Sequence, residues 1–337
     1  MVSSQEARSR NLRNVALAAI VPLPAILFYL SFLRLCPNGS NEEENQVLDQ
    51  WGFRVCKLGE NHPIAFLNII VFFCFSVLFW IISLFQQSTW LVDPYWTIVP
   101  VMIGYYYSTH PHAKSDPWRS TTVMILLWVW NIRLEHSYFR REKWQWGATE
   151  DWRFADMRKQ FQGHWWWASF FLCYISQQIL LVGICLPLYA VFSSNAPWNM
   201  WDMLATLLCG TGIVISYFAD SQLHRFVSKN ENLKDLGVPT EPLLETGLWR
   251  YSRHPNYFGE QLWWWALALY AWNLGQGWLV VGTIVNSACM AKVTVMVEQR
   301  MMQKPSRATI YHNYQQSTSV WIPWFKLQPQ KKAKKIM

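Results

Sequence analysis

The chain has 337 residues, of which 52% are hydrophobic and only 15% are charged. Soluble domains carry about 25% charged residues, so this composition excludes an ordinary soluble domain and predicts a membrane protein. The net charge of +8 does not indicate nucleic-acid binding, because basic residues of membrane proteins mainly follow the positive-inside rule.

Eight apolar segments are candidates for membrane-spanning helices, since a helix needs about 20 apolar residues to cross a bilayer. They lie at about 15–34, 63–85, 90–108, 117–133, 165–192, 199–219, 258–277 and 278–297. Polar residues lie inside or beside some of these segments, so we expect six to eight spanning helices, with eight preferred. The sequence therefore predicts an all-α, polytopic membrane helix bundle.

The charged loops predict which side of the membrane each end faces. Arg8, Arg10 and Arg13 precede the first segment and the tail is rich in lysine, so both termini are expected in the cytosol. The acidic loop at about 35–62 is expected on the other side, and eight helices satisfy these assignments. Three regions follow: the first helix with its non-cytosolic loop (1–62), the main membrane domain (63–326) and the basic tail (327–337).

Two features of the loops bear on the cellular compartment. Cys36 and Cys56 both lie in the acidic loop and could pair if that side is oxidising, but the sequence leaves this pairing open. The chain ends KKIM, whose lysines occupy the positions of a retrieval signal for the endoplasmic reticulum. Attraction of the basic tail to anionic headgroups is the alternative. We expect a multi-pass protein of the endoplasmic reticulum membrane.

The stretch GLWRYSRHPNYFGE combines polar groups with the start of an apolar segment. Arg253 suits phosphate geometry, Asn256 offers a donor and an acceptor, and Glu260 is an ionisable group in an apolar helix. Pro255 disfavours a helical conformation for His254. The alternative is an interfacial belt in which Glu260 caps the helix, which does not explain the Pro-Asn interruption. The stretch is predicted to bind a ligand.

A second polar site lies in the motif WLVDPYW, at the start of the third predicted segment. Asp93 and Tyr95 form a carboxylate–tyrosine pair, and a phenol with a pKa of about 10 stays protonated and can donate in a dry pocket. The alternative is that Asp93 caps a helix starting at Pro94. The sequence leaves both interpretations open.

The charged stretch TEDWRFADMRKQ predicts an amphipathic helix that begins near Thr149, with acidic residues in its first turn and basic residues in its last. Its other interpretation is that Arg153 and Arg158, together with Arg133 and Arg140 upstream, contact phosphates. A Rossmann domain is not supported, because the glycines at 210–212 lack the full fingerprint. No metal site is predicted, because the histidines are isolated from cysteine and carboxylate partners.

Together these motifs resemble the steroid 5α-reductase-like membrane proteins, in particular a subgroup named 3-oxo-5α-steroid 4-dehydrogenase-like. The resemblance covers about 60–326 and rests on DPYW, EDWRF, YFADSQLHRF, GLWRYSRHPNYFGE and YHNYQQSTSVWIPWF. HPNYFGE is similar to Pro-Asn-Tyr-x-Gly-Glu of steroid 5α-reductases and to Arg-His-x-Asn-Tyr-x-Gly-Asp of sterol C14 reductases. In those relatives this stretch binds NADPH within a bundle of membrane helices.

The resemblance implies an NADPH site that combines residues of several motifs: Arg133, Arg153, Gln222, Arg253, His254, Asn256, Tyr257, Glu260 and Tyr314. The chain departs from the family in two respects. Gln222 is followed by Leu223 where sterol reductases have lysine, so one phosphate contact is missing. The glutamate–tyrosine pair that activates the carbonyl in steroid 5α-reductases has no obvious counterpart, and Asp93 and Tyr95 are the substitutes.

The function expected from these features is NADPH-dependent reduction of a carbon–carbon double bond in a steroid- or isoprenoid-like enone. Hydride would reach the β-carbon while Tyr95, or another tyrosine of the pocket, polarises the oxygen in a water-free site. One alternative is a methyltransferase, because isoprenylcysteine and phospholipid methyltransferases share an Arg-His-Pro-x-Tyr-x-Gly stretch that binds S-adenosylmethionine. Another is a non-enzymatic sterol-binding or scaffold protein. The expected partners are a lipophilic small molecule and membrane lipids, and the sequence does not predict the oligomeric state.

Overall fold

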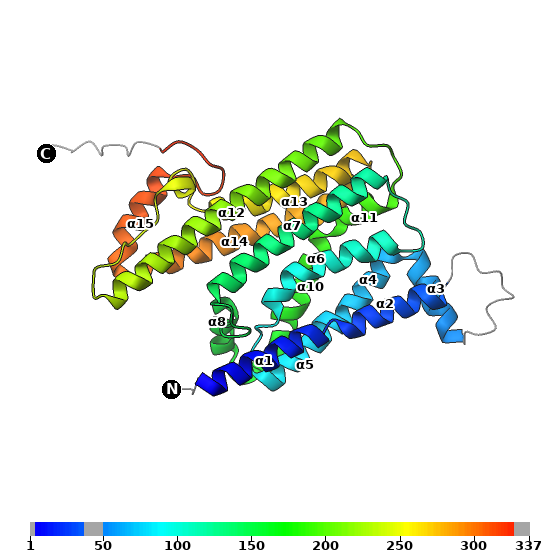
Figure 1. The fold of residues 1–337 in the computed structure, drawn as a ribbon, viewed down its shortest axis with the longest axis horizontal. Helices are drawn as coiled ribbons and strands as arrows, with labels where there is room; N and C mark the ends of the chain where they lie inside the picture. Colours follow the sequence, from blue (N-terminus) through cyan, green and yellow to red (C-terminus); the bar gives the residue numbers. More distant parts are fainter. Residues whose placement is uncertain (1–3, 37–49, 327–337) are drawn as a thin grey trace. The chain divides into compact units, whose positions relative to one another are not determined.

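The computed structural model describes residues 4–36 and 50–326, and its regular elements are helices (Figure 1). This part of the chain contains no β-strand, only an isolated bridge between Ser252 and Ser319. The described residues therefore confirm the predicted all-α class. The KKIM tail lies outside them.

The described chain divides into two compact units. The first contains the residues up to Met203 together with Leu267–Thr283. Its elements are α1 (Ser4–Ile20), α2 (Leu23–Leu35), α3 (Gln50–Asn61), α4 (Pro63–Val71), the π-helix η2 (Phe72–Val77), α5 (Leu78–Gln86), α6 (Val92–Thr109), α7 (Pro117–Arg141), α8 (Trp152–Phe161), the 3-10 helix η3 (Gln162–His164), α9 (Trp165–Ser169), the π-helix η4 (Phe170–Ile175), α10 (Ser176–Ile184), α11 (Leu186–Ser193) and the 3-10 helix η6 (Gly277–Val280).

The second unit contains Leu204–Ala266 and the residues from Ile284 onward. Two of its elements lie wholly within it, the 3-10 helix η5 (Gly247–Arg250) and α15 (Pro305–Ser317). Three longer helices have one end in each unit: α12 (Met200–Asp235), α13 (Pro255–Asn273) and α14 (Val281–Met302).

Five helical runs in the described residues are long and apolar enough to cross a membrane: Gln5–Leu35, Pro63–Gln86, Trp152–Ser193, Met200–Asp235 and Gly277–Met302. They coincide with five predicted segments, and the protein is therefore a multi-pass membrane protein. The other three predicted segments are also helical, as α6, α7 and α13, but do not combine the same length and apolarity. The preferred count of eight spans stays a prediction.

The first predicted span is interrupted between α1 and α2. Pro22 precedes α2 and Pro24 lies in its first turn, where the missing proline N–H and the ring interrupt the hydrogen-bond ladder of a continuous helix. Cys36 directly follows α2 and forms a disulfide with Cys56 of α3, with the two Cα atoms 5.4 Å apart. The pairing that the sequence left open is present, and it ties α3 to the end of α2.

A buried ion pair joins the starts of α7 and α12 within the first unit. Arg119 Nε and Nη2 each donate to a carboxylate oxygen of Asp202 at 2.8 Å, and both side chains are fully buried. The same guanidinium also donates to the carbonyls of Ala196 and Pro197. Because a buried charge is tolerated only with a partner and further hydrogen bonds, this contact specifies which helix ends meet.

In the second unit, α12 and α13 approach each other at two glycines. A Cβ added to Gly259 would lie 2.2 Å from Ser216 Oγ and 2.6 Å from the carbonyl oxygen of Gly212. Small residues permit such close backbone approach between membrane helices. The first turns of α13, which carry the HPNYFGE motif, are therefore held directly against α12.

Candidate functional site

The chain before α13 runs beside a C-terminal segment. The N–H of Arg253 donates to the carbonyl of Ser319 at 2.9 Å, and the N–H of His254 donates to that of Val320 at 3.0 Å. The helix begins at Pro255, so His254 lies outside it, as predicted. The structure thus brings together GLWRYSRHPNYFGE and YHNYQQSTSVWIPWF, which are far apart in the sequence.

A carboxylate on α14 organises the cationic part of this stretch. Glu298 Oε1 accepts from Arg253 Nε at 2.7 Å and lies 3.0 Å from His254 Nε2. Arg253 also donates to the carbonyls of Gln315 and Thr318, and Gln315 donates to Glu298. Both Arg253 and His254 are buried. Their polar atoms are therefore engaged within the protein, and Glu298, which sequence reasoning missed, is their common partner.

Two tyrosines complete the packing of this stretch. The hydroxyl of Tyr314 donates to the carbonyls of Trp249 and Ser252, and burial raises the pKa of this phenol. Tyr257 stacks on the His254 ring, with centroids 5.0 Å apart and planes inclined by 11°. The Tyr314 hydroxyl thus holds the main chain of Trp249 and Ser252, which leads into the predicted cofactor site.

Asn256 differs from its neighbours because one half of its carboxamide is unsatisfied. Its Nδ2 donates to Asp220 Oδ1 at 3.1 Å, and Ser216 Oγ donates to its main-chain carbonyl at 3.1 Å. Its Oδ1 is buried and has no hydrogen-bond partner among the described residues. Glu260 lies in the second turn of α13, so the part of the belt interpretation in which it caps this helix was wrong, while the interfacial belt itself stays an alternative.

Gln222, which the motif comparison suggested for the cofactor, contacts the main chain. Its Oε1 accepts from the N–H of Leu248 at 2.9 Å. The neighbouring Gly247 has a φ of 61°, a left-handed conformation that suits glycine, and a Cβ there would lie 2.5 Å from Gln222 Oε1. Gln222 therefore fixes the turn that opens the motif.

A basic groove of about 440 Å³ follows the C-terminal half of α12. Lys229 in its wall forms an ion pair with Glu241, and the side chains of both are about half exposed. The groove is lined by His224, Arg225, Ser228, Lys229, Asn232, Leu233 and Leu236. Arg225 beside the Ser228 hydroxyl suits a phosphate of a nucleotide, whereas the charge of Lys229 is already neutralised by Glu241. The sequence analysis had not singled out Arg225.

In the first unit, the DPYW motif opens α6. The helix begins at Val92, and no side chain forms a hydrogen bond as its N-cap, so the alternative that Asp93 caps a helix starting at Pro94 was wrong. Asp93 lies in the first turn, within electrostatic reach of Asp151, Arg141 and Arg153. The carboxylate therefore has both like and opposite charges around it.

The EDWRF segment lies next to this motif. Glu150 Oε1 accepts from the N–H of Thr89 at 2.9 Å and from Arg158 Nη2 at 2.6 Å. Asp151 caps α8, so the helix begins two residues later than predicted. Burial raises the pKa of Asp151, but the hydrogen bonds and charge of Arg153 outweigh this effect and lower it overall.

Arg153 and Arg133 both belong to the first unit. Arg153 is paired with Asp151 through two contacts, Nε to Oδ1 at 2.9 Å and Nη2 to Oδ2 at 2.6 Å. Arg133 is buried on α7. The positive charge of Arg153 is thus already neutralised by Asp151, so Arg153 would attract a phosphate more weakly than an unpaired arginine.

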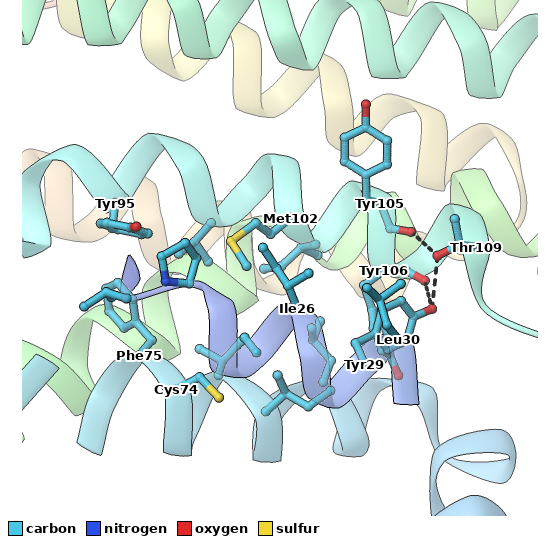
Figure 2. Close-up of a pocket in the computed structure, with 18 of the residues that line it drawn as sticks. Ile26, Tyr29, Leu30, Cys74, Phe75, Tyr95, Met102, Tyr105, Tyr106 and Thr109 are labelled. Atoms are coloured by element: carbon cyan, nitrogen blue, oxygen red, sulfur yellow. Dashed lines mark hydrogen bonds between the residues drawn. The ribbon is translucent and has the colours of Figure 1, made fainter. Parts of the chain in front are cut away.

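Tyr95 lines an apolar cavity of about 380 Å³ in the first unit (Figure 2). The cavity lies among side chains of α2, α4, η2, α5 and α6, and its volume is within the range of small-molecule sites. The hydroxyl of Tyr95 donates to the carbonyl of Ala18. The cavity suits a lipophilic ligand, and Tyr95 can donate to that ligand only after its hydroxyl leaves Ala18.

Residues 79–318 match a family model described as a protein of unknown function, DUF1295. An uncharacterized protein of Schizosaccharomyces pombe is 28% identical over 219 residues, which cover 60% of this chain and 63% of the relative. The match thus spans less than two thirds of that relative. No solved structure matches the chain. Because the family model covers well over half of the chain, including the DPYW and HPNYFGE motifs, the protein belongs to the DUF1295 family.

Proposed function

We propose that this protein is an NADPH-dependent reductase of the endoplasmic reticulum membrane that acts on a carbon–carbon double bond of a lipophilic enone. The observation that carries the proposal is the buried Oδ1 of Asn256, which finds no hydrogen-bond partner in the described part of the chain. An orphaned acceptor of this kind is costly unless a donor reaches it. The carboxamide and ribose hydroxyls of NADPH are donors of the required kind.

The resemblance of HPNYFGE to the NADPH-binding stretch of steroid 5α-reductases supports the same assignment. Asn256 would hold the cofactor through its Oδ1 acceptor, while Arg225 in the α12 groove would neutralise a phosphate. When bound, NADPH supplies the hydride. The chain's own contribution is orientation, since Glu298 fixes Arg253 and His254, and Asp220 fixes Asn256.

The substrate would occupy the apolar cavity beside α6, where few polar groups compete with a lipophilic molecule. Excluding water there strengthens any hydrogen bond to a developing enolate oxygen. Tyr95 is the proposed donor, and its hydroxyl must rotate from Ala18 toward the substrate.

Asn256→Ala is expected to weaken NADPH binding about threefold to tenfold, the effect of losing one hydrogen bond, without preventing membrane insertion. The measurement is calorimetric titration of the detergent-purified protein. The matched control is Asn273→Ala on the same helix, because both amide atoms of Asn273 are engaged, with Asp202 and Asn199. If Asn256→Ala bound NADPH as tightly as the wild type, the assignment of this site to the cofactor would be contradicted.

The same titration with NADPH, NADH and S-adenosylmethionine tests the class of the protein. Selective binding of NADPH supports the reductase. Binding of S-adenosylmethionine alone would indicate a methyltransferase. Binding of none of the three ligands would favour a sterol-binding or scaffold role.

Tyr95→Phe is expected to lower NADPH oxidation with cholestenone as the enone by about a hundredfold, with unchanged NADPH affinity. The substitution removes the donor and keeps the ring that packs edge-on against Phe79. The control is Tyr107→Phe on the same helix, whose buried hydroxyl has no hydrogen-bond partner in the described chain. Equal turnover in both variants would assign the proton donor elsewhere.

A further inference from the structure

Four of the five hydroxyl groups with which the described residues line the apolar cavity donate to main-chain carbonyls, and the fifth, that of Tyr105, accepts from Trp128 Nε1. The donors and their acceptors are Tyr29 to Tyr106 (2.8 Å), Tyr106 to Pro63 (2.9 Å), Thr109 to Tyr105 (2.7 Å) and Tyr95 to Ala18. The hydrogen of each of these four hydroxyl groups is thus already used in a hydrogen bond within the protein. What these side chains offer to a ligand is oxygen lone pairs.

Two of these oxygens lie together at one end of the cavity (Figure 2). Tyr29 and Thr109 have their hydroxyl oxygens 3.2 Å apart. Each has a carbonyl acceptor at a shorter distance, so neither hydrogen needs to lie between them. The ring of Tyr105 points away from this pair, and its hydroxyl accepts from Trp128 Nε1. At this end of the cavity, the described residues therefore present two hydrogen-bond acceptors, the hydroxyl oxygens of Tyr29 and Thr109, and no free donor.

We infer that the cavity binds a lipid alcohol, whose hydroxyl donates to the Tyr29–Thr109 pair while its hydrocarbon lies along α2 and α6. A ketone or ester oxygen only accepts, so it would meet lone pairs here or force one of the main-chain hydrogen bonds to break. A hydroxyl supplies the missing hydrogen without disturbing either bond.

The dimensions of the cavity fit such a molecule. Thr109 follows Tyr95 by 14 residues on α6, which is about 21 Å of helix. An extended hydrocarbon chain advances roughly 1.2 Å per bond, as an extended main chain does, so hexadecanol has a similar length. Ile26 and Leu30 of the cavity lining are exposed on the protein surface, which gives a hydrocarbon a route from the bilayer. The inference concerns the same cavity that the proposed reduction assigns to its substrate, but it requires no cofactor, so the two proposals can fail separately.

The test uses the full chain in phosphatidylcholine nanodiscs, without cofactor, and a tritiated diazirine analogue of hexadecanol as the photolabel. Competition by hexadecanol is compared with competition by its methyl ether, which keeps the chain and the oxygen but lacks the hydroxyl hydrogen. A second arm compares cholesterol with cholesteryl methyl ether and so separates fused-ring from straight-chain alcohols. In at least one arm the alcohol is expected to compete about fivefold better than its ether, the effect of one hydrogen bond, with labelling on α2 and α6.

Tyr29→Phe and Thr109→Val, which keep the side-chain shape, are expected to remove this preference for the alcohol and to leave competition by the ether unchanged. The control is Ser108→Ala, because the Ser108 hydroxyl donates to the carbonyl of Tyr105 but does not line the cavity. Equal competition by alcohol and ether in both arms, or labelling confined to other helices, would overturn the inference. The wild-type comparison alone decides this, whether or not a variant folds.

Discussion

Glu298→Ala is expected to lower the free energy of unfolding by about 3–5 kcal/mol and to weaken NADPH binding. The substitution leaves Arg253 and His254 without their shared carboxylate, in side chains that are only 9% and 6% exposed. It also releases Gln315, so that α15 and the segment beside the HPNYFGE motif lose an anchor. The measurement is thermal unfolding of the purified protein, with calorimetric titration of NADPH on the same sample.

The control for this prediction is Glu241→Ala in the same unit. Glu241 is paired with Lys229, but both side chains are about half exposed, and exposed ion pairs contribute about 0–1 kcal/mol. A small change in Glu241→Ala and a large one in Glu298→Ala would show that burial of the pair sets the cost. If the two variants unfolded alike, the Glu298 cluster would not hold the motif in place.

Gly259→Ala is expected to destabilise the protein by about 3 kcal/mol, at the upper end of overpacking costs, and to reduce NADPH affinity. A single methyl group at this position meets Ser216 Oγ and the Gly212 carbonyl at distances that no carbon atom tolerates. Because one of these atoms belongs to the main chain, α12 and α13 must separate. That separation moves Asn256 relative to Asp220.

Gly210→Ala provides the matched comparison, since it places the same methyl group on α12 where nothing lies within 4 Å. Replacing an interior helical glycine by alanine stabilises a helix by up to about 1 kcal/mol, so this variant is expected to be as stable as the wild type or slightly more stable. Both are compared by thermal unfolding. Equal stability of the two variants would contradict the close approach at Gly259.

Much of the fold could be predicted from the sequence because a membrane helix is specified by its own composition. All eight predicted segments are helical. The boundaries were less predictable, because they depend on local competition: Asp151, not Thr149, caps α8, and Thr149 instead forms a hydrogen bond with Glu142. The helix α3 within the acidic loop was missed because its apolar content is low, and it is tied down by the disulfide.

The candidate site was predictable where its residues are contiguous and not where they come from other helices. Asn256 and its neighbours form one motif, so their chemistry is visible in the sequence. Their partners Glu298 and Asp220 lie on α14 and α12 and become apparent only in the fold. The available signal for both was a carboxylate close to the end of a long apolar run. Gln222 shows the converse, because its motif suggested a cofactor contact and its oxygen binds the main chain.

The buried pair of Arg119 and Asp202 has a consequence for the biosynthesis of the protein. The two residues are 83 positions apart, and synthesis at about 5–20 residues per second separates them by about 4–17 s. During that interval the Arg119 guanidinium, which is fully buried in the folded protein, lacks the carboxylate that neutralises it. The contact between the starts of α7 and α12 therefore forms only after the start of α12 has been synthesised, so the packing of one helix end depends on the translation of another.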